Sequence, residues 1–188
     1  MSGKERYQMQ QTILTNEKRI DVFLKVIIAL LIITGLSYFS LPFLSRKIVS
    51  LIEMMGVRGG LYSFAVKLRQ GAVYNAAHYP FMGYGTDLLG FAHLMFALLL
   101  VGPIIDADKN EWVIRFGIMV CTLFIPVVLI MGWIREIPII WRVMSCLMGA
   151  TGFLLLFRVF KMVKMNQRLE QDIESLNQKK INPDIRVA

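Results

Sequence analysis

Cysteine and histidine are scarce in this chain of 188 residues, which has two of each. Cys121 and Cys146 each lie about eight residues into an apolar run. Because the two runs must be antiparallel, the thiols differ in depth and no disulfide is expected. The chain also lacks an HExxH helix, a phosphate-binding loop and a nucleophile motif. These absences exclude the enzyme classes that short motifs identify.

Charge is missing from long stretches of the chain. Residues 26–44, 88–105 and 116–134 carry no charged residue, and 137–157 carries only Arg142. A bilayer core of about 30 Å needs about 20 helical residues, and lipid offers no hydrogen-bond partners to other backbone conformations. The sequence therefore predicts an all-α fold, a polytopic bundle of four transmembrane helices. We place the spans at 22–44, 87–105, 113–134 and 137–158.

Acidic residues are the minority charge, 13 against 21 Lys and Arg, for a net charge of +8. The basic residues lie at the ends of the predicted spans, so they set topology and no nucleic-acid partner is expected. An N-terminal arm (1–19) and a tail (163–188) are both basic and flank a transmembrane domain (20–162). The positive-inside rule then predicts both termini in the cytoplasm. The polar arm, expected to be mobile, is too long for a cleaved signal peptide, which favours an uncleaved signal anchor.

The segment 45–86 is the large outer loop of this topology. Before Gly59-Gly60, four apolar residues share one helical face: Ile48, Leu51, Ile52 and Met55. After it, the same spacing recurs in Leu61, Phe64, Ala65 and Leu68. Both patterns predict short amphipathic helices that lie on the outer leaflet or cap the bundle.

The ionisable residues Asp87, His93 and Arg142 lie on the outer side of the predicted spans. Beside His93 runs a stripe of small residues that should face protein and not lipid: Thr86, Gly90 and Ala97. A charge left unpaired in lipid costs several kcal/mol, so we expect Asp87 to pair with Arg142, with His93 as a neighbour. With His78 of the outer loop, these residues form the predicted polar cluster.

Three interpretations of the polar cluster are open. Its residues fix helix register and snorkel to the headgroups, or they line a water-filled vestibule for ions, protons or a small ligand, or they hold a cofactor. A haem between His78 and His93 is conceivable but not expected, because membrane cytochromes usually need facing pairs of histidines. No metal site is predicted.

The turn 106–112 joins the second and third spans as an antiparallel hairpin. Its acidic residues do not match a calcium loop, because Glu111 stands where a glycine is required. We expect Asp108 to cap the third helix, with Glu111 completing a capping box.

The tail continues the fourth span with a heptad pattern. Its a and d positions are Val159, Met162, Asn166, Leu169, Ile173 and Leu176. A buried Asn at an a position favours a defined register and oligomeric state. The pattern predicts self-association or partner binding, as a homo-oligomer or a subunit of a membrane complex, although a solvated helical extension is equally open.

Three stretches, YGTDLLGFAHLMFA, GPIIDADKNEWVIRFG and IREIPIIWR, resemble a family of small uncharacterised bacterial integral-membrane proteins over residues 80–145. The resemblance implies a bacterial inner-membrane address and no activity. We expect a non-enzymatic membrane component, namely a subunit, sensor or small pore. The alternative is a membrane redox or lipid-modifying enzyme with a haem, quinone or lipid site near His93.

Overall fold

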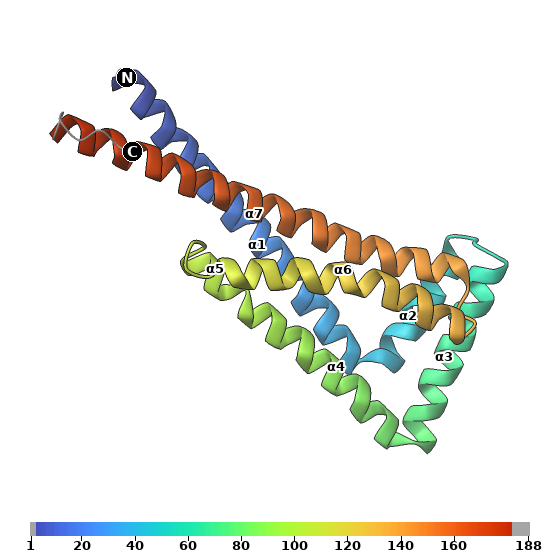
Figure 1. Cartoon of the computed structure of the whole chain (residues 1–188). Helices are drawn as coiled ribbons and strands as arrows, with labels where there is room; N and C mark the ends of the chain where they lie inside the picture. The colour runs from blue at the N-terminus through green and yellow to red at the C-terminus, as the bar shows by residue number, and fades with distance from the viewer. Residues whose placement is uncertain (1–2, 182–188) are drawn as a thin grey trace.

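The computed structural model describes residues 3–181 of the chain (Figure 1). Its helices are α1 (Gly3–Phe39), α2 (Leu41–Met54), α3 (Gly60–His78), α4 (Pro80–Leu99), α5 (Val101–Ile105), α6 (Glu111–Ile134) and α7 (Ile139–Ile181). No strand occurs within this part of the chain, so the predicted all-α class is confirmed. The ends of the predicted arm and tail, 1–2 and 182–188, lie outside the described residues.

Both ends of the described chain lie at one end of the molecule, called here the terminal end, and α2 and α3 lie at the other (Figure 1). α1 packs against α4 and α7, α6 packs along α7, and α2 packs on α3. Four segments are long and apolar enough to cross a membrane: Lys4–Phe39, Pro80–Ile105, Glu111–Ile134 and Ile139–Gln178. The four predicted membrane helices are therefore present.

Proline accounts for three of the helix boundaries. Pro42 has no N–H to continue a helix, so α1 ends at Phe39 and α2 begins with Pro42 in its first turn. Pro80 is the first residue of α4. Pro103 cannot donate to the carbonyl of Leu99, and the helix breaks there between α4 and α5. The first predicted span, 22–44, therefore runs past the end of α1 into α2, whereas the second, 87–105, lies inside Pro80–Ile105.

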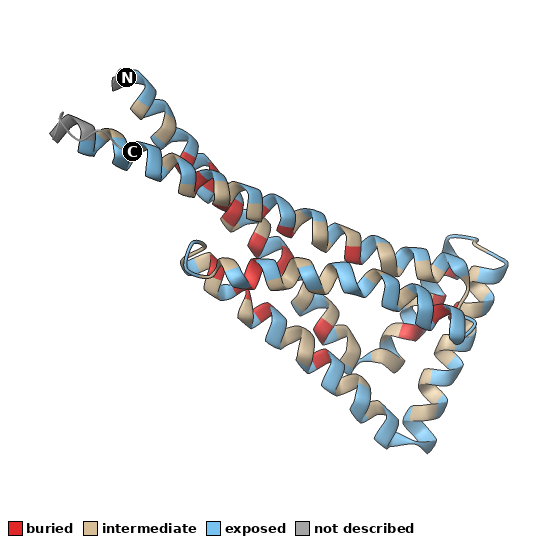
Figure 2. Ribbon diagram, viewed as in Figure 1, coloured by how far each residue is buried: buried red, intermediate tan, exposed pale blue. Residues whose placement is uncertain are grey.

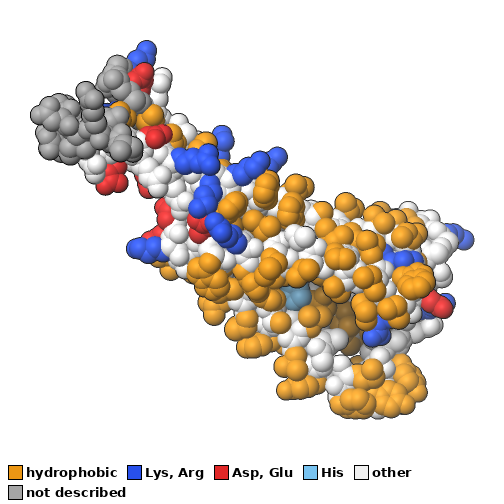
Figure 3. Space-filling view, in the orientation of Figure 1, with side chains coloured by type: hydrophobic (Ala, Val, Ile, Leu, Met, Phe, Trp, Pro, Cys, Tyr) orange, Lys and Arg blue, Asp and Glu red, His pale blue; other side chains and the backbone are white. Residues whose placement is uncertain are grey.

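The four membrane helices expose large apolar side chains. Each has at least one that is more than half exposed: Ile33, Phe91, Leu123 and Leu147. Leaving such a side chain in water costs roughly 1.5–3 kcal/mol relative to burial, and lipid removes that cost. Exposed residues run along all of these helices (Figure 2). The apolar surface separates a large charged group at the terminal end from a smaller one at the opposite end (Figure 3). This distribution fits a multi-pass membrane protein.

The stripe of small residues on α4 faces α1, as predicted. Gly90 and Ala97 are buried, and the backbones of the two helices nearly touch. A Cβ added to Gly90 would lie 2.8 Å from the carbonyl oxygen of Gly35, and one added to Gly35 would lie 3.0 Å from the carbonyl oxygen of Gly90. Only glycine permits this approach, because backbone atoms cannot rotate out of the way.

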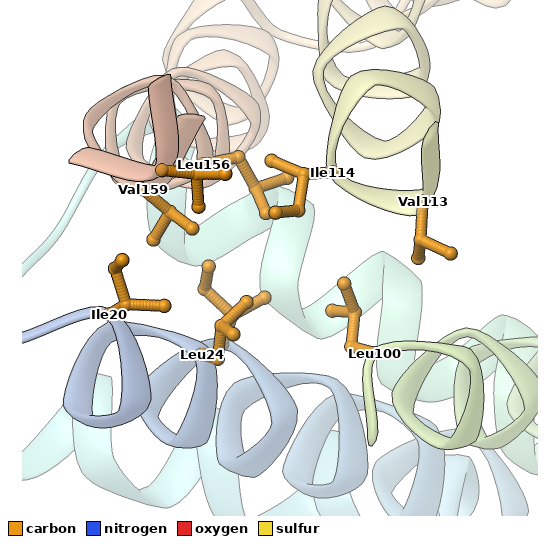
Figure 4. Packing of buried hydrophobic residues seen from close by; sticks show 9 residues of the cluster. Ile20, Leu24, Leu100, Val113, Ile114, Leu156 and Val159 are labelled. Atoms are coloured by element: carbon orange, nitrogen blue, oxygen red, sulfur yellow. The ribbon is translucent and has the colours of Figure 1, made fainter. Parts of the chain in front are cut away.

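The main apolar core lies in the half of the bundle nearer the terminal end (Figure 4). Leu24 of α1, Ile114 of α6 and Val159 of α7 have no exposed surface. The other labelled members of the cluster surround them: Ile20, Leu100, Val113 and Leu156. These side chains join α1, α4, α6 and α7 into one bundle at this level.

We predict that Gly90→Ala lowers the melting temperature of the detergent-solubilised protein. The added methyl group meets the backbone of α1, and overpacking of this kind costs about 1–3 kcal/mol. Gly85→Ala, on the same helix, is the control, because no heavy atom lies within 4 Å of an added Cβ there. Equal melting temperatures for the two variants would contradict the close α1–α4 contact.

Candidate functional site

α2 and α3 form a hairpin with a small core of its own. Val49, Ile52 and Ala65 are buried in it, with Trp141 of α7 packed against them. The predicted apolar faces were partly wrong. On α3, Ala65 is buried and Phe64 contacts Trp141, but Tyr62 and Val66 pack on the core in place of Leu61 and Leu68; on α2, Leu51 and Met55 are exposed and Val49 is buried. The spacing of apolar residues fits more than one face of each helix, and the packing of α2 on α3 decides which face is buried.

An open pocket of about 810 Å³ lies where α3 runs past the first turns of α2. Its lining comes from Arg46 of α2 and from α3: Lys67, Arg69, Gln70, Gly71, Val73, Tyr74, Ala77 and His78. No carboxylate is among these residues. The pocket is therefore strongly basic, and its polar atoms are mainly donors.

The three cations of the pocket, Arg46, Lys67 and Arg69, have no hydrogen bond or ion pair of their side chains within the described residues. The nearby acid, Glu53, accepts a 2.9 Å hydrogen bond from the hydroxyl of Tyr62. This bond and the Glu53 charge raise the pKa of the Tyr62 phenol. The pocket cations therefore form no ion pair with Glu53, although the charge of Arg69 partly offsets the rise in the pKa of Tyr62.

Within the described residues, four cations of the terminal half form ion pairs. The ion pairs are Lys25–Asp21, Lys109–Asp106, Arg115–Glu111 and Lys164–Glu111. Hydrogen bonds from the backbone and side chain of Lys109 lower the pKa of the Asp106 carboxyl. Other cations of this half, such as Lys18, Arg158 and Arg168, have no ion pair within the described residues, so unpaired cations occur at both ends of the molecule.

His78 of the predicted cluster belongs to this pocket. Its ring stacks on Tyr74, with centroids 4.2 Å apart, and its Nδ1 lies 3.0 Å from the Tyr74 carbonyl oxygen. A carbonyl can only accept, so Nδ1 carries the proton and Nε2 is the remaining polar atom of the ring. The sequence did not associate His78 with Arg46, Lys67 and Arg69, whose charges it used only for topology.

His93 lies elsewhere, in the contact between α4 and α1. Its ring packs against Tyr38 at 5.1 Å, and its Nδ1 donates to the Leu89 carbonyl oxygen at 2.8 Å. The helical rise from Pro80 to His93 is about 20 Å, so His78, two residues before Pro80, cannot face His93 across one haem iron. Within the described residues no group of three His, Cys, Asp or Glu is placed to hold a metal ion.

Asp87 and Arg142 are not paired, and the expected ion pair was wrong. Nε of Arg142 donates to the carbonyl oxygen of Ile137 at 2.8 Å, within the turn between α6 and α7. Its methylene groups cover Gly132, where they would meet an added Cβ. Asp87 has no hydrogen bond or ion pair within the described residues. Similar depth did not bring the charges together, because α4 packs mainly on α1 while α7 packs on α6 and α1.

The heptad seam of the tail packs against α1 of the same chain, forming an antiparallel pair called here the terminal hairpin. Val159, Val163 and Asn166 of α7 are buried, as are Ile13, Asn16 and Ile20 of α1. Nδ2 of Asn16 donates to Oδ1 of Asn166 at 2.8 Å, and Nη1 of Arg6 donates to Oδ1 of Asn177. The arm was expected to be mobile, but its residues from 3 onward are helical.

The sequence contains a signal for this pairing that its first interpretation missed. Met9, Ile13, Asn16, Ile20, Phe23 and Ile27 repeat at steps of four and three, which is a heptad pattern. The buried asparagines occur once on each helix, so their hydrogen bond is satisfied in one register only.

Glu111 joins α6 to α7 next to the terminal hairpin. Its carboxylate accepts from Arg115 at 2.6 Å and from Lys164 at 2.7 Å, and Gln167 donates to both Glu111 and Asp108. The expected capping box was wrong, because Asn110 is the N-cap of α6 and makes no side-chain capping bond. Glu111 instead connects α6 to α7, and its carboxylate lies at the positive end of the α6 dipole.

In comparisons with known proteins, no family model, no curated protein and no solved structure matches this chain. The resemblance to a bacterial membrane family stays a prediction. Function is therefore inferred from the α2–α3 pocket, the terminal hairpin and the helices that connect them.

We predict that the effects of Asp87→Asn and Arg142→Gln on melting temperature are additive. The side chains share no contact, and independent sites usually add within about 0.5 kcal/mol. Arg142→Gln alone should destabilise, because it removes the bond to Ile137 and the cover over Gly132. Partial rescue by the double change would instead show that the charges interact.

Proposed function

We propose that this chain is a non-enzymatic component of a bacterial inner membrane, a sensor or a subunit of a complex, whose terminal hairpin binds a partner in the cytoplasm. The observation that carries the proposal is the hairpin itself. Its two helices continue past the apolar windows, and the buried bond between Asn16 and Asn166 holds them in register. A pair of helices built this way beyond the membrane has no role in spanning it.

The outer face of the hairpin supports the assignment of a partner. Tyr7 and Leu14 are at least half exposed on α1 and lie seven residues apart, on one helical face. The seam residues are already used within the chain, so they are not free for another protein. The partner surface is therefore the outer face, and the earlier assignment of the seam to binding between chains is not retained.

The connection between the two ends of the molecule supports a sensor. α1 runs unbroken from the hairpin to Phe39, next to α2, and α7 runs unbroken from Ile139 to the hairpin. At its beginning, α7 packs Trp141 against Phe64 of α3, with ring centroids 5.2 Å apart. A displacement of α2 and α3 would move two continuous helices whose other ends form the hairpin.

The distribution of charge supports cytoplasmic termini. The arm and tail at the terminal end carry more basic residues than the opposite end, although the segment 45–86 weakens this bias with five of its own: Arg46, Lys47, Arg58, Lys67 and Arg69. A small pore is not retained, because apolar side chains fill the bundle between α1, α6 and α7 at the terminal half.

Topology is tested with reporters. One fused after Ala188 should be active only in the cytoplasm, and one inserted between Gly59 and Gly60 only outside. This position is chosen because it lies at the exposed connection between α2 and α3, where an added Cβ meets no heavy atom within 4 Å. A cytoplasmic signal from the Gly59–Gly60 insertion would contradict the topology.

The partner role is tested with the full-length chain in mildly solubilised membranes. Wild type should migrate on native gels in a complex larger than the 21.5 kDa chain in its detergent micelle. Tyr7→Gln with Leu14→Gln should release it, since the outer face loses its apolar contacts. Gln8→Ala with Thr15→Ala, each one residue along the helix, is the control and should keep the complex. A mobility that neither pair changes, or a wild type that migrates alone, would contradict the proposal.

A further inference from the structure

We propose that the α2–α3 pocket binds the phosphate of a phospholipid headgroup that carries net negative charge. This inference goes beyond the proposed function and does not depend on the terminal hairpin. Its basis is the placement of Arg46, Lys67 and Arg69 around one open pocket of about 810 Å³ at the end of the membrane helices.

The donor set suits a phosphate. The guanidinium groups of Arg46 and Arg69 can each donate two parallel hydrogen bonds to phosphate oxygens, and the ammonium of Lys67 adds a point charge. Gln70 contributes further hydrogen-bonding capacity at the lining. No acid lines the pocket, so nothing in the lining repels an anion or recognises the ammonium of a zwitterionic headgroup.

The cations of the pocket have no protein counterion. At the terminal end, Glu111 alone receives two cations, and Asp21 and Asp106 receive one each. Around the pocket, within the described residues, the side chains of Arg46, Lys67 and Arg69 have no ion pair. Like charges gathered on one surface repel, and an anion bound among them removes that repulsion.

The position of the pocket favours a lipid over a soluble phosphate. α3 ends at His78, and α4 begins two residues later as a membrane helix. The first side chains of that helix are apolar and exposed, with Phe81 at 72% and Tyr84 at 65%. The acyl chains of a headgroup bound near His78 would thus have exposed apolar residues of the next helix to pack on, and tyrosines and basic residues are typical of a membrane interface.

The experiment uses the full-length protein in nanodiscs. Three proteins are compared: wild type, the pocket variant Arg46→Gln with Arg69→Gln, and the control variant Arg58→Gln with Arg135→Gln. The two variants lose the same amount of positive charge. Arg58 and Arg135 are exposed at the same end of the molecule but do not line the pocket. Each protein is placed in phosphatidylcholine alone and in phosphatidylcholine with increasing phosphatidylglycerol. Retained lipid is counted by native mass spectrometry, and melting temperature is followed in parallel.

Wild type should retain phosphatidylglycerol and melt at a higher temperature as its fraction rises. The pocket variant should bind about 30-fold more weakly, since each lost cation near an anionic lipid is worth about fivefold. The control should change less than twofold. In phosphatidylcholine alone, all three should share one melting temperature and one helix content, which separates binding from folding.

Three outcomes would overturn the proposal. Equal losses in the pocket variant and the control would show general surface charge and no site. Equal retention of both lipids by wild type would show that the pocket does not prefer an anionic headgroup. Stabilisation by millimolar inorganic phosphate or glycerol phosphate in phosphatidylcholine, matching that by phosphatidylglycerol, would show a soluble ligand and not a lipid. None of these results bears on the partner of the terminal hairpin, so the two proposals fail separately.

Discussion

Along the seam between α1 and α7, apolar side chains pack from Leu156 at one end to Ile13 near the other, with Asn16 and Asn166 bonded between them. This antiparallel contact carries the main core, because α6 packs on α7 and α4 packs on α1. The α1–α7 contact thus joins the α1–α4 pair to the α6–α7 pair, with α5 as a further link between α4 and α6. Loss of the α1–α7 register would displace these two pairs relative to each other.

The two ends of the molecule treat charge differently. At the terminal end, Glu111 is surrounded by Arg115, Lys164 and Gln167, so the charged groups there connect helices. At the other end, the cations of α2 and α3 have no such partners within the described residues, and apolar packing against Trp141 holds these helices in place. Glu111 and its partners thus connect helices at one end, whereas the cations of α2 and α3 form no ion pair that would hold their hairpin.

The predictions that held concern properties of single helices. Uncharged length identified the four membrane helices, small-residue spacing placed Gly90 and Ala97 toward a neighbour, and the heptad spacing of α7 identified its buried side. The predictions that failed required knowledge of which helices are neighbours. Asp87 and Arg142 share a depth, yet α4 and α7 pack on different partners. The basic pocket was missed for the same reason. Arg46 lies on α2 and Lys67 on α3, and residue spacing does not show how the connection between these helices folds back.

Composition and periodicity by themselves determined that this chain is helical, that it contains four membrane-length helices, and which stripe of α4 and α7 is buried. These are consequences of backbone hydrogen bonding in lipid and of the 3.6-residue turn, and both act within one helix. Only the tertiary structure decided that the tail pairs with the arm of its own chain, that His78 joins three cations while His93 packs on Tyr38, and that Arg142 bonds to a turn instead of an acid. Each of these depends on how the helices are arranged, and several arrangements would bury the same apolar stripes. Close packing at Gly35 and Gly90 and the buried pair of asparagines select one arrangement.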